Sequence, residues 1–221
     1  QHFDDGEIPG ILRNRWFERR HMMHQTARWQ RDRHRQLQTA WMNGSGIVVW
    51  EVVFGSWVGW SARDRATLRT MLPIQRHFAR LFSGEGWTPL VQTEAANVYA
   101  TLWDGGGIRL WTLVNRQGQP VSGLLLKIPA MERATYYDVV TGQKLDPSVE
   151  KGEVLLQGKL PSHGIGGFVT ATPEALGPEF EQLMARQRSH QSSAYWPGDF
   201  PQRSVVLLGE PLHYGREAEP T

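Results

Sequence analysis

Apolar residues recur with two different periods along this chain, and the change of period divides it. Up to about residue 95, stretches with helical spacing alternate with short continuous apolar runs. From residue 97 to residue 172 apolar and polar residues alternate, as in half-buried strands. Beyond residue 173 a short helical pattern leads into a segment rich in Ser and Pro. We therefore expect three parts, 1–95, 96–172 and 173–221.

Two helices are expected in the first part. Residues 31–42 contain good helix formers with apolar residues on one side, and Asn43-Gly44 supplies a stop. Residues 61–64 have the spacing of a capping box, and apolar residues recur at helical spacing from there to residue 82. Pro73 lies inside this second pattern and predicts a kink or a division near Leu72.

A strand is expected between these helices. Ile47-Val48-Val49-Trp50 is a continuous apolar run, typical of a strand buried on both faces in a parallel sheet. Helix, strand, loop and helix form one βα repeat, and residues 3–5 are a candidate end of the preceding strand. The order predicts an α/β layered domain.

The second part is expected to contain strands only. Asp104-Gly105-Gly106-Gly107 separates two alternating runs and predicts a hairpin. Close spacing predicts a small antiparallel β-sandwich whose strands are 98–103, 108–115, 121–128, 135–140, 154–160 and 166–170. In the third part, residues 178–188 predict a helix, and the Pro-rich stretch after Ser192 is interpreted as a linker or tail.

Composition limits the function classes. Twenty-four Lys and Arg against 22 Asp and Glu leave a charge of +2, which does not favour a nucleic-acid or membrane partner. The absence of Cys excludes disulfides, thiolate metal sites and a cysteine nucleophile. No apolar run reaches 18 residues, and the first residues lack both a Met and a signal-peptide core. We expect a piece of a longer protein.

Tryptophan is the compositional anomaly. Six of the 10 Trp fall within the first 60 residues. Two interpretations stay open, a large core and a cleft lined with flat rings, because Trp dominates packing wherever it is buried and is also frequent at binding sites.

Several short motifs together resemble the C-terminal part of bacterial glycoside-hydrolase-like proteins. They are Asn43-Gly44-Ser45-Gly46, Trp50-Glu51, Phe54-Gly55, Trp57, Arg63-Asp64, the run from Leu110 to Arg116, and Gly164-Ile165-Gly166. The resemblance covers about residues 1–172. It implies the last βα units of a (β/α)8 barrel in 1–95, followed by an antiparallel β-sandwich in 96–172.

The resemblance also implies partners and a setting. It implies a carbohydrate partner and favours an exported or periplasmic location. Some similar chains continue into a domain of the sulfatase-modifying type, which the tail after Ser192 would suit. A complete barrel takes about 250 residues and eight βα units. The first 95 residues offer about two units, so we expect an N-terminal part of the same barrel to be missing.

Glu51 is the main candidate for chemistry, because functional side chains of barrels come from the C-terminal ends of strands. Glycoside hydrolysis ordinarily needs a second carboxyl group. Asp4, Asp5 and Glu7 lie about one βα unit earlier, and Asp5 is preferred. The other interpretation makes Glu51 a structural carboxylate that caps the loop at 52–60 or pairs with Arg63.

Substrate contacts are expected around these carboxylates. Trp57 and Trp60 follow Glu51 in a Gly-containing loop, and an aromatic ring can stack on the apolar face of a sugar. Asp4 and His2 complete the candidate substrate-binding residues.

No metal or cofactor is expected. His21, His24 and His34 are spaced too loosely for a site, and the many surrounding Arg would repel a divalent ion. Two hypotheses remain, a glycoside hydrolase-like enzyme and a non-catalytic carbohydrate-binding or accessory module.

Overall fold

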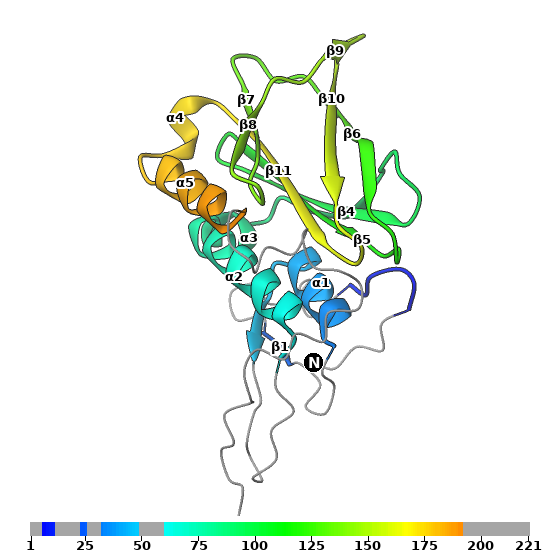
Figure 1. Cartoon of the computed structure of the whole chain (residues 1–221). Coiled ribbons are helices and arrows are strands. Elements are labelled where there is room, and N and C mark those ends of the chain that lie inside the picture. The colour runs from blue at the N-terminus through cyan, green and yellow to red at the C-terminus, as the bar shows by residue number, and fades with distance from the viewer. Residues whose placement is uncertain (1–5, 12–22, 26–31, 49–59, 192–221) are drawn as a thin grey trace, which may run out of the picture.

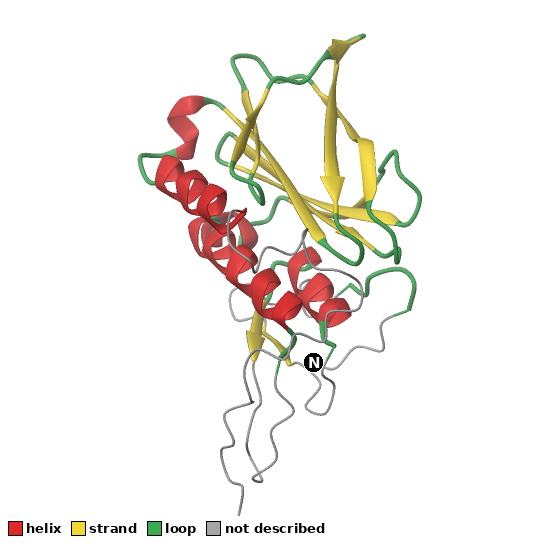
Figure 2. Cartoon of the chain, viewed as in Figure 1, coloured by secondary structure: helices red, strands yellow, loops and turns green. Residues whose placement is uncertain are grey.

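The computed structural model describes residues 6–11, 23–25, 32–48 and 60–191 (Figure 1). These residues form a mixed structure of antiparallel sheets and a few helices (Figure 2). The helices are α1 (His34–Met42), α2 (Ala62–His77), α3 (Ala79–Phe82), α4 (Pro173–Leu176) and α5 (Phe180–Gln191). The strands are β1 (Met23–Gln25), β2 (Gly46–Val48), β3 (Trp87–Val91), β4 (Val98–Gly105), β5 (Ile108–Asn115), β6 (Val121–Pro129), β7 (Thr135–Asp138), β8 (Gln143–Leu145), β9 (Val149–Glu150), β10 (Glu153–Leu160) and β11 (Ile165–Ala171).

The largest sheet has six antiparallel strands in the order β3-β4-β5-β11-β7-β8. Its centre is β5, which pairs along its whole length with β4 and along seven residues with β11. Strand β5 is buried at six of its eight positions because the sheet is covered on both faces. Leu110 and Val114 face the helices, whereas Trp111 and Leu113 face the second sheet.

The second sheet, β6-β10-β9, lies opposite the first (Figure 1). Its buried residues Leu126 and Leu156 share one core with Trp111 and Phe168 of the six-stranded sheet. The two sheets therefore bury one face each against the other.

Helices cover the opposite face of the six-stranded sheet (Figure 2). Trp41 of α1 is completely buried, and its indole Nε1 donates a hydrogen bond to the Gly166 carbonyl of β11 at 2.8 Å. Met71 of α2 and Met184 of α5 belong to the same core. One continuous core thus joins residues on both sides of the predicted division near residue 95.

A third, two-stranded sheet pairs β1 with β2 in parallel. Helix α1 lies between them in the chain, so the segment is a β-α-β unit followed by α2. The predicted parallel strand is confirmed over Gly46–Val48, but Ile47 and Val48 are half-buried rather than fully buried. Its described partner is Met23–Gln25. The alternative predecessor, residues 3–5, lies outside the described residues.

The predicted strands of the second part are confirmed within one or two residues. The Gly106-Gly107 turn, with φ of 60° and 79°, closes the predicted hairpin, in which Gly105 pairs with Ile108. Residues 97–172 contain strands and turns without a helix. Strand β3 pairs with β4, so the sheet already includes Trp87–Val91. The domain boundaries at 95/96 and 172/173 stay predictions.

Pro73 does not divide α2, so the predicted division near Leu72 is wrong, whereas the alternative, a kink, stays a prediction. The helix continues to His77, and the break falls at Phe78. Met71 and Ile74 on either side of the proline are completely buried, which holds the helix against its neighbours. In the turn before Pro73, buried Gln187 of α5 donates a hydrogen bond to the Thr70 carbonyl at 2.9 Å. Tertiary packing therefore outweighs the local effect of proline.

Two predicted helix ends agree with the structure, whereas α1 begins three residues later than expected and α5 ends three residues later. Gly44 stops α1 with a φ of 54°, and Ser61 caps α2 by accepting a hydrogen bond from the Asp64 N–H at 3.0 Å. In the described part of the chain, no helix combines the length and the apolar character needed to cross a membrane.

Replacing Trp41 with Phe should lower the free energy of unfolding by about 2 to 4 kcal/mol, because it removes buried volume and the hydrogen bond to Gly166. Urea denaturation measures the change. Tyr99→Phe is the control, since it removes only a hydroxyl from a half-buried ring of the same core. Equal effects of the two substitutions would contradict a special role of Trp41.

Candidate functional site

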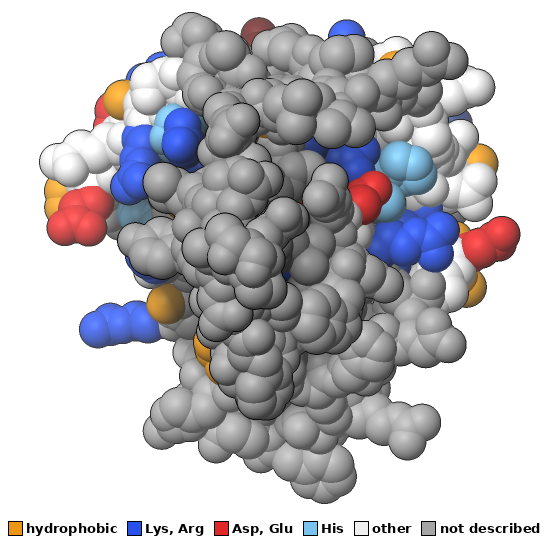
Figure 3. All heavy atoms as spheres, turned by 60° about the horizontal axis from the view of Figure 1, so that its bottom comes forward, with side chains coloured by type: hydrophobic (Ala, Val, Ile, Leu, Met, Phe, Trp, Pro, Cys, Tyr) orange, Lys and Arg blue, Asp and Glu red, His pale blue; other side chains and the backbone are white. Residues whose placement is uncertain are grey.

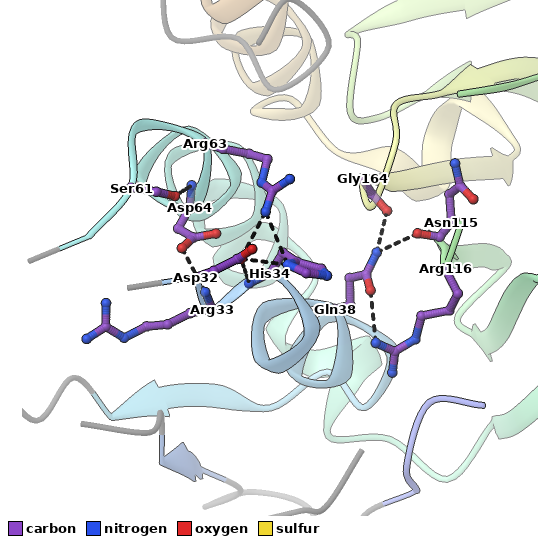
Figure 4. Close-up of polar contacts among 10 residues, drawn as sticks. All are labelled: Asp32, Arg33, His34, Gln38, Ser61, Arg63, Asp64, Asn115, Arg116 and Gly164. Carbon is purple, nitrogen blue, oxygen red and sulfur yellow. Dashed lines mark hydrogen bonds and ion pairs between the residues drawn. The ribbon is translucent and has the colours of Figure 1, made fainter. Parts of the chain in front are cut away.

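The described part of the candidate site lies where α1 and α2 begin. Because β1 and β2 are parallel, the segments that leave them start at the same end of the pair. Those segments lead to the N-termini of α1 and α2, and side chains from the two N-termini contact each other (Figure 4). In α/β proteins this carboxyl end of parallel strands is where binding sites are built.

An ion-pair cluster joins the two helix N-termini. Asp32 Oδ1 lies 2.6 Å from His34 Nδ1 and 2.9 Å from Arg63 Nη2. The same oxygen accepts a hydrogen bond from the His34 backbone N–H at 3.1 Å. The bond from the His34 ring holds the pKa of the Asp32 carboxyl well below its usual range, and the charges of His34 and Arg63 act in the same direction. Asp32 is therefore ionised at any ordinary pH.

Asp64 is the second carboxyl of the cluster. It is completely buried, and its Oδ2 accepts a hydrogen bond from the Arg33 backbone N–H at 2.9 Å. Burial raises its pKa, and the hydrogen bond from Arg33 opposes that shift. The site thus contains two carboxyl groups whose pKa values are moved in opposite directions, an arrangement that suits one group to stay charged and the other to hold a proton.

Arg33, whose backbone N–H bonds to Asp64, places its side chain over the Trp60 ring. The Arg33 guanidinium lies 4.6 Å from the centre of the Trp60 ring, and the Arg33 side chain is almost fully buried. Trp60 is half-buried and packs against the helical core. One face of the ring is therefore occupied by Arg33.

The antiparallel sheets also contribute to the cluster. His163, in the turn between β10 and β11, stacks on His34 with ring centres 4.4 Å apart. Burial and the charges of His34 and Arg63 lower the pKa of His163 to about 4. Buried Gln38 fastens the same turn to α1, because its Nε2 donates hydrogen bonds to the carbonyls of Gly164 and Asn115 (Figure 4).

Three polar atoms of the cluster have unused hydrogen-bonding capacity. His34 Nε2, Arg63 Nε and Asp64 Oδ1 are buried and have no partner within the described ranges. They include a donor, an acceptor and a ring nitrogen that can act as either. Such a mixture suits a ligand or water whose hydroxyl groups both donate and accept.

Most of the site residues predicted from sequence fall outside the described residues. These are Glu51, Asp5, Trp57, Asp4 and His2. Trp60 lies within the described residues, where its ring contacts the Arg33 guanidinium. It stays a candidate for contact with a ligand. Arg63, the predicted ion-pair partner of Glu51, pairs with Asp32. The described ranges contain no group of three or more His, Asp or Glu side chains arranged to hold a metal ion.

Sequence reasoning missed Asp32 and His163 as members of the site. Asp32 lies two residues before His34 and about one βα unit before Arg63, so spacing gave no sign of the contact. His163 comes from a turn about 100 residues beyond Arg63. The capping-box spacing did point to Asp64, although its side chain bonds to Arg33 rather than back to Ser61.

Comparison with known proteins gives partial structural neighbours only. No family model and no curated protein matches the chain. Neighbours among solved structures include an endoxylanase of glycoside hydrolase family 30 from Clostridium papyrosolvens C71, with 16% identity, 68% of this chain and 42% of that chain covered, and a TM-score of 0.38. A putative alpha-galactosidase/melibiase from Bacteroides fragilis NCTC 9343 has 14% identity, coverages of 63% and 28%, and a TM-score of 0.38.

A third neighbour is a xylanase of glycoside hydrolase family 30 subfamily 8 from Clostridium acetobutylicum. Its identity is 15%, its coverages are 45% of this chain and 27% of that chain, and its TM-score is 0.30. The chain spans less than half the length of each of these three structures.

The neutral His163 should make stability pH-dependent. The pKa of His163 is about 6.5 in the unfolded chain and about 4 in the folded protein. The free energy of unfolding should therefore fall as pH drops from about 6.5 to about 4, and His163→Asn should reduce that fall. Asn tolerates the positive φ of 50° at this position.

Lys151→Asn is the matched control, because Lys151 is exposed and has a similar φ of 51°. Chemical denaturation at several pH values measures the effect. If His163→Asn keeps the wild-type slope across this window, His163 is not the group responsible.

Proposed function

We propose that this chain is part of a glycoside-hydrolase-like protein that acts on carbohydrate through the carboxyl end of the β1–β2 pair. The observation that carries the proposal is the parallel β-α-β unit, because Glu51 follows Val48 of β2 by three residues in the segment that leaves this end. In this proposal residues 1–95 are the last units of a (β/α)8 barrel that includes further strands, and 96–172 are its β-sandwich.

Glu51 is proposed as general acid or nucleophile, and Asp5 as the second carboxyl group. A glycosidic bond is cleaved between two carboxyls, one of which protonates the leaving oxygen while the other attacks or activates water. Trp57, Trp60, Asp4 and His2 are proposed to contact the sugar.

The cluster of Asp32, His34 and Arg63 supports a polar ligand at this end. Its unpartnered buried atoms offer both donors and acceptors, as sugar hydroxyls require. A purely apolar ligand would leave these atoms unsatisfied.

The alternative function is a non-catalytic carbohydrate-binding or accessory module. Carbohydrate-binding surfaces commonly use flat exposed rings. In the described strands, however, every aromatic side chain is buried or half-buried. A carbohydrate is therefore expected to contact the Trp-rich first 60 residues rather than a face of the antiparallel sheets. This expectation is the same for the enzyme and for the binding module.

Replacing Glu51 with Gln should lower glycoside cleavage by about 100-fold or more, while unfolding changes by less than about 1 kcal/mol. Release of reducing ends from a panel of polysaccharides measures cleavage, and urea denaturation measures stability. Glu153→Gln, at an exposed strand end, is the matched control.

Three outcomes are informative. Loss of cleavage with Glu51→Gln alone supports the enzyme. Saccharide binding by the wild type with no cleavage of any polymer supports the accessory module. A large loss of stability in Glu51→Gln identifies a structural carboxylate and contradicts the proposed role.

A further inference from the structure

A row of arginines lies on the exposed side of α2 and α3. Arg65, Arg69 and Arg76 follow each other at spacings of four and seven residues, which places them on one face of α2. Arg80 follows in α3, after the break at Phe78. All four are exposed. At a rise of about 1.5 Å per residue the part of the row on α2 is about 16 Å long. It begins one residue after Asp64, and therefore at the candidate site.

Residues 62–82 contain no exposed acidic side chain that could neutralise the arginine row. Arg65 and Arg69 are four residues apart, as are Arg76 and Arg80, so each pair repels. Asp64 is the only acidic residue in 62–82, and it is buried. Arg65 also lies in the first turn of α2, where the helix dipole disfavours a cation. Arg65, Arg76 and Arg80 form no ion pair with any described residue.

Helix α5 enlarges the same surface. Gln187 fixes α5 to α2 through the Thr70 carbonyl. Arg186 is exposed, and burial together with the charges of Arg186 and Arg69 lowers the pKa of His190, so these groups lie close together. Figure 3 shows Lys or Arg side chains next to His side chains at this end of the molecule, with acidic side chains also visible. On α5, Glu181 pairs with Arg188 at 2.8 Å, so Arg186 is the cation that this helix adds to the row.

We propose that this arginine face binds a polysaccharide that carries carboxylate groups, such as a polyuronate, along α2 from the candidate site. The proposal rests on the proposed carbohydrate function and adds the class of substrate. Guanidinium groups pair with carboxylates in a bidentate geometry, and a row of them suits a polymer with a charge on successive units.

Other polyanions fit the surface less well. The large exposed apolar residues of the described chain are Ile8, Met23, Leu90 and Val149, and none of them belongs to α2, α3 or α5. A membrane would therefore find no apolar side chain to insert there. A single-stranded nucleic acid would find no exposed ring for stacking among the described aromatic residues.

The test compares polygalacturonate with its fully methyl-esterified form, which has the same backbone without the charge. Binding is measured by isothermal titration calorimetry at low salt. A triple variant, Arg65→Gln, Arg76→Gln and Arg80→Gln, should weaken polygalacturonate binding by about tenfold or more. The matched control carries Lys144→Gln, Lys151→Gln and Lys159→Gln, three exposed residues with the same loss of charge. It should change affinity by less than about twofold.

Glu51→Gln separates this proposal from the proposed chemistry. If it abolishes cleavage and leaves polygalacturonate binding intact, the arginine face acts independently of the catalytic carboxyl. Equal effects of the two triple variants would overturn the proposal, as would equal affinity for the methyl-esterified polymer. Tighter binding to duplex DNA or to anionic vesicles than to polygalacturonate would overturn it too.

Discussion

The close approach of both layers to β11 at Gly166 and Gly167 is the constraint on which the rest of the structure depends. A Cβ atom on Gly166 would lie 2.2 Å from Leu160 of the second sheet, and one on Gly167 would lie 2.9 Å from Val139 and 3.2 Å from Trp41. The absence of a side chain at Gly166 therefore makes room for the second sheet, and its absence at Gly167 makes room for the helical layer. Trp41 completes the contact by bonding to the Gly166 carbonyl. A side chain at Gly166 would require Leu160 to shift, and one at Gly167 would require Val139 and Trp41 to shift.

This contact also positions the candidate site. The end of β10 and the start of β11 are fixed by the packing of Leu160 and Trp41, so the turn between them is held against α1. Gln38 bonds to the Gly164 carbonyl, and His163 stacks on His34. The antiparallel sheets are therefore attached to the helical layer and also supply a ring to the cluster at the helix N-termini. A change of sheet packing would reach the Asp32–His34–Arg63 cluster through a single turn.

Local signals in the sequence predicted much of the fold. Alternation in 97–172 predicts the strands, and the glycine turn at 106–107 predicts the hairpin. These signals are local, because burial of one or both faces of a strand fixes which of its residues are apolar. The same reasoning failed at Pro73, where buried neighbours and Gln187 sustain a helix that local chemistry would break. It also missed the half-burial of β2, which depends on how many strands lie beside it. Of the site, spacing revealed the cap at Ser61, whereas the contacts of Asp32 and His163 depend on tertiary proximity alone.

The edges of the six-stranded sheet have a consequence for how the molecule behaves in a crowded solution. In β3 the register shifts between Thr88 and Val91, Pro89 offers no N–H, and Leu90 adopts a φ of 53°. The opposite edge, β8, has only three residues and carries Lys144. An extended chain from another molecule would find few consecutive backbone groups to pair with at either edge. The six-stranded sheet is thereby protected against growing into a fibril by strand addition.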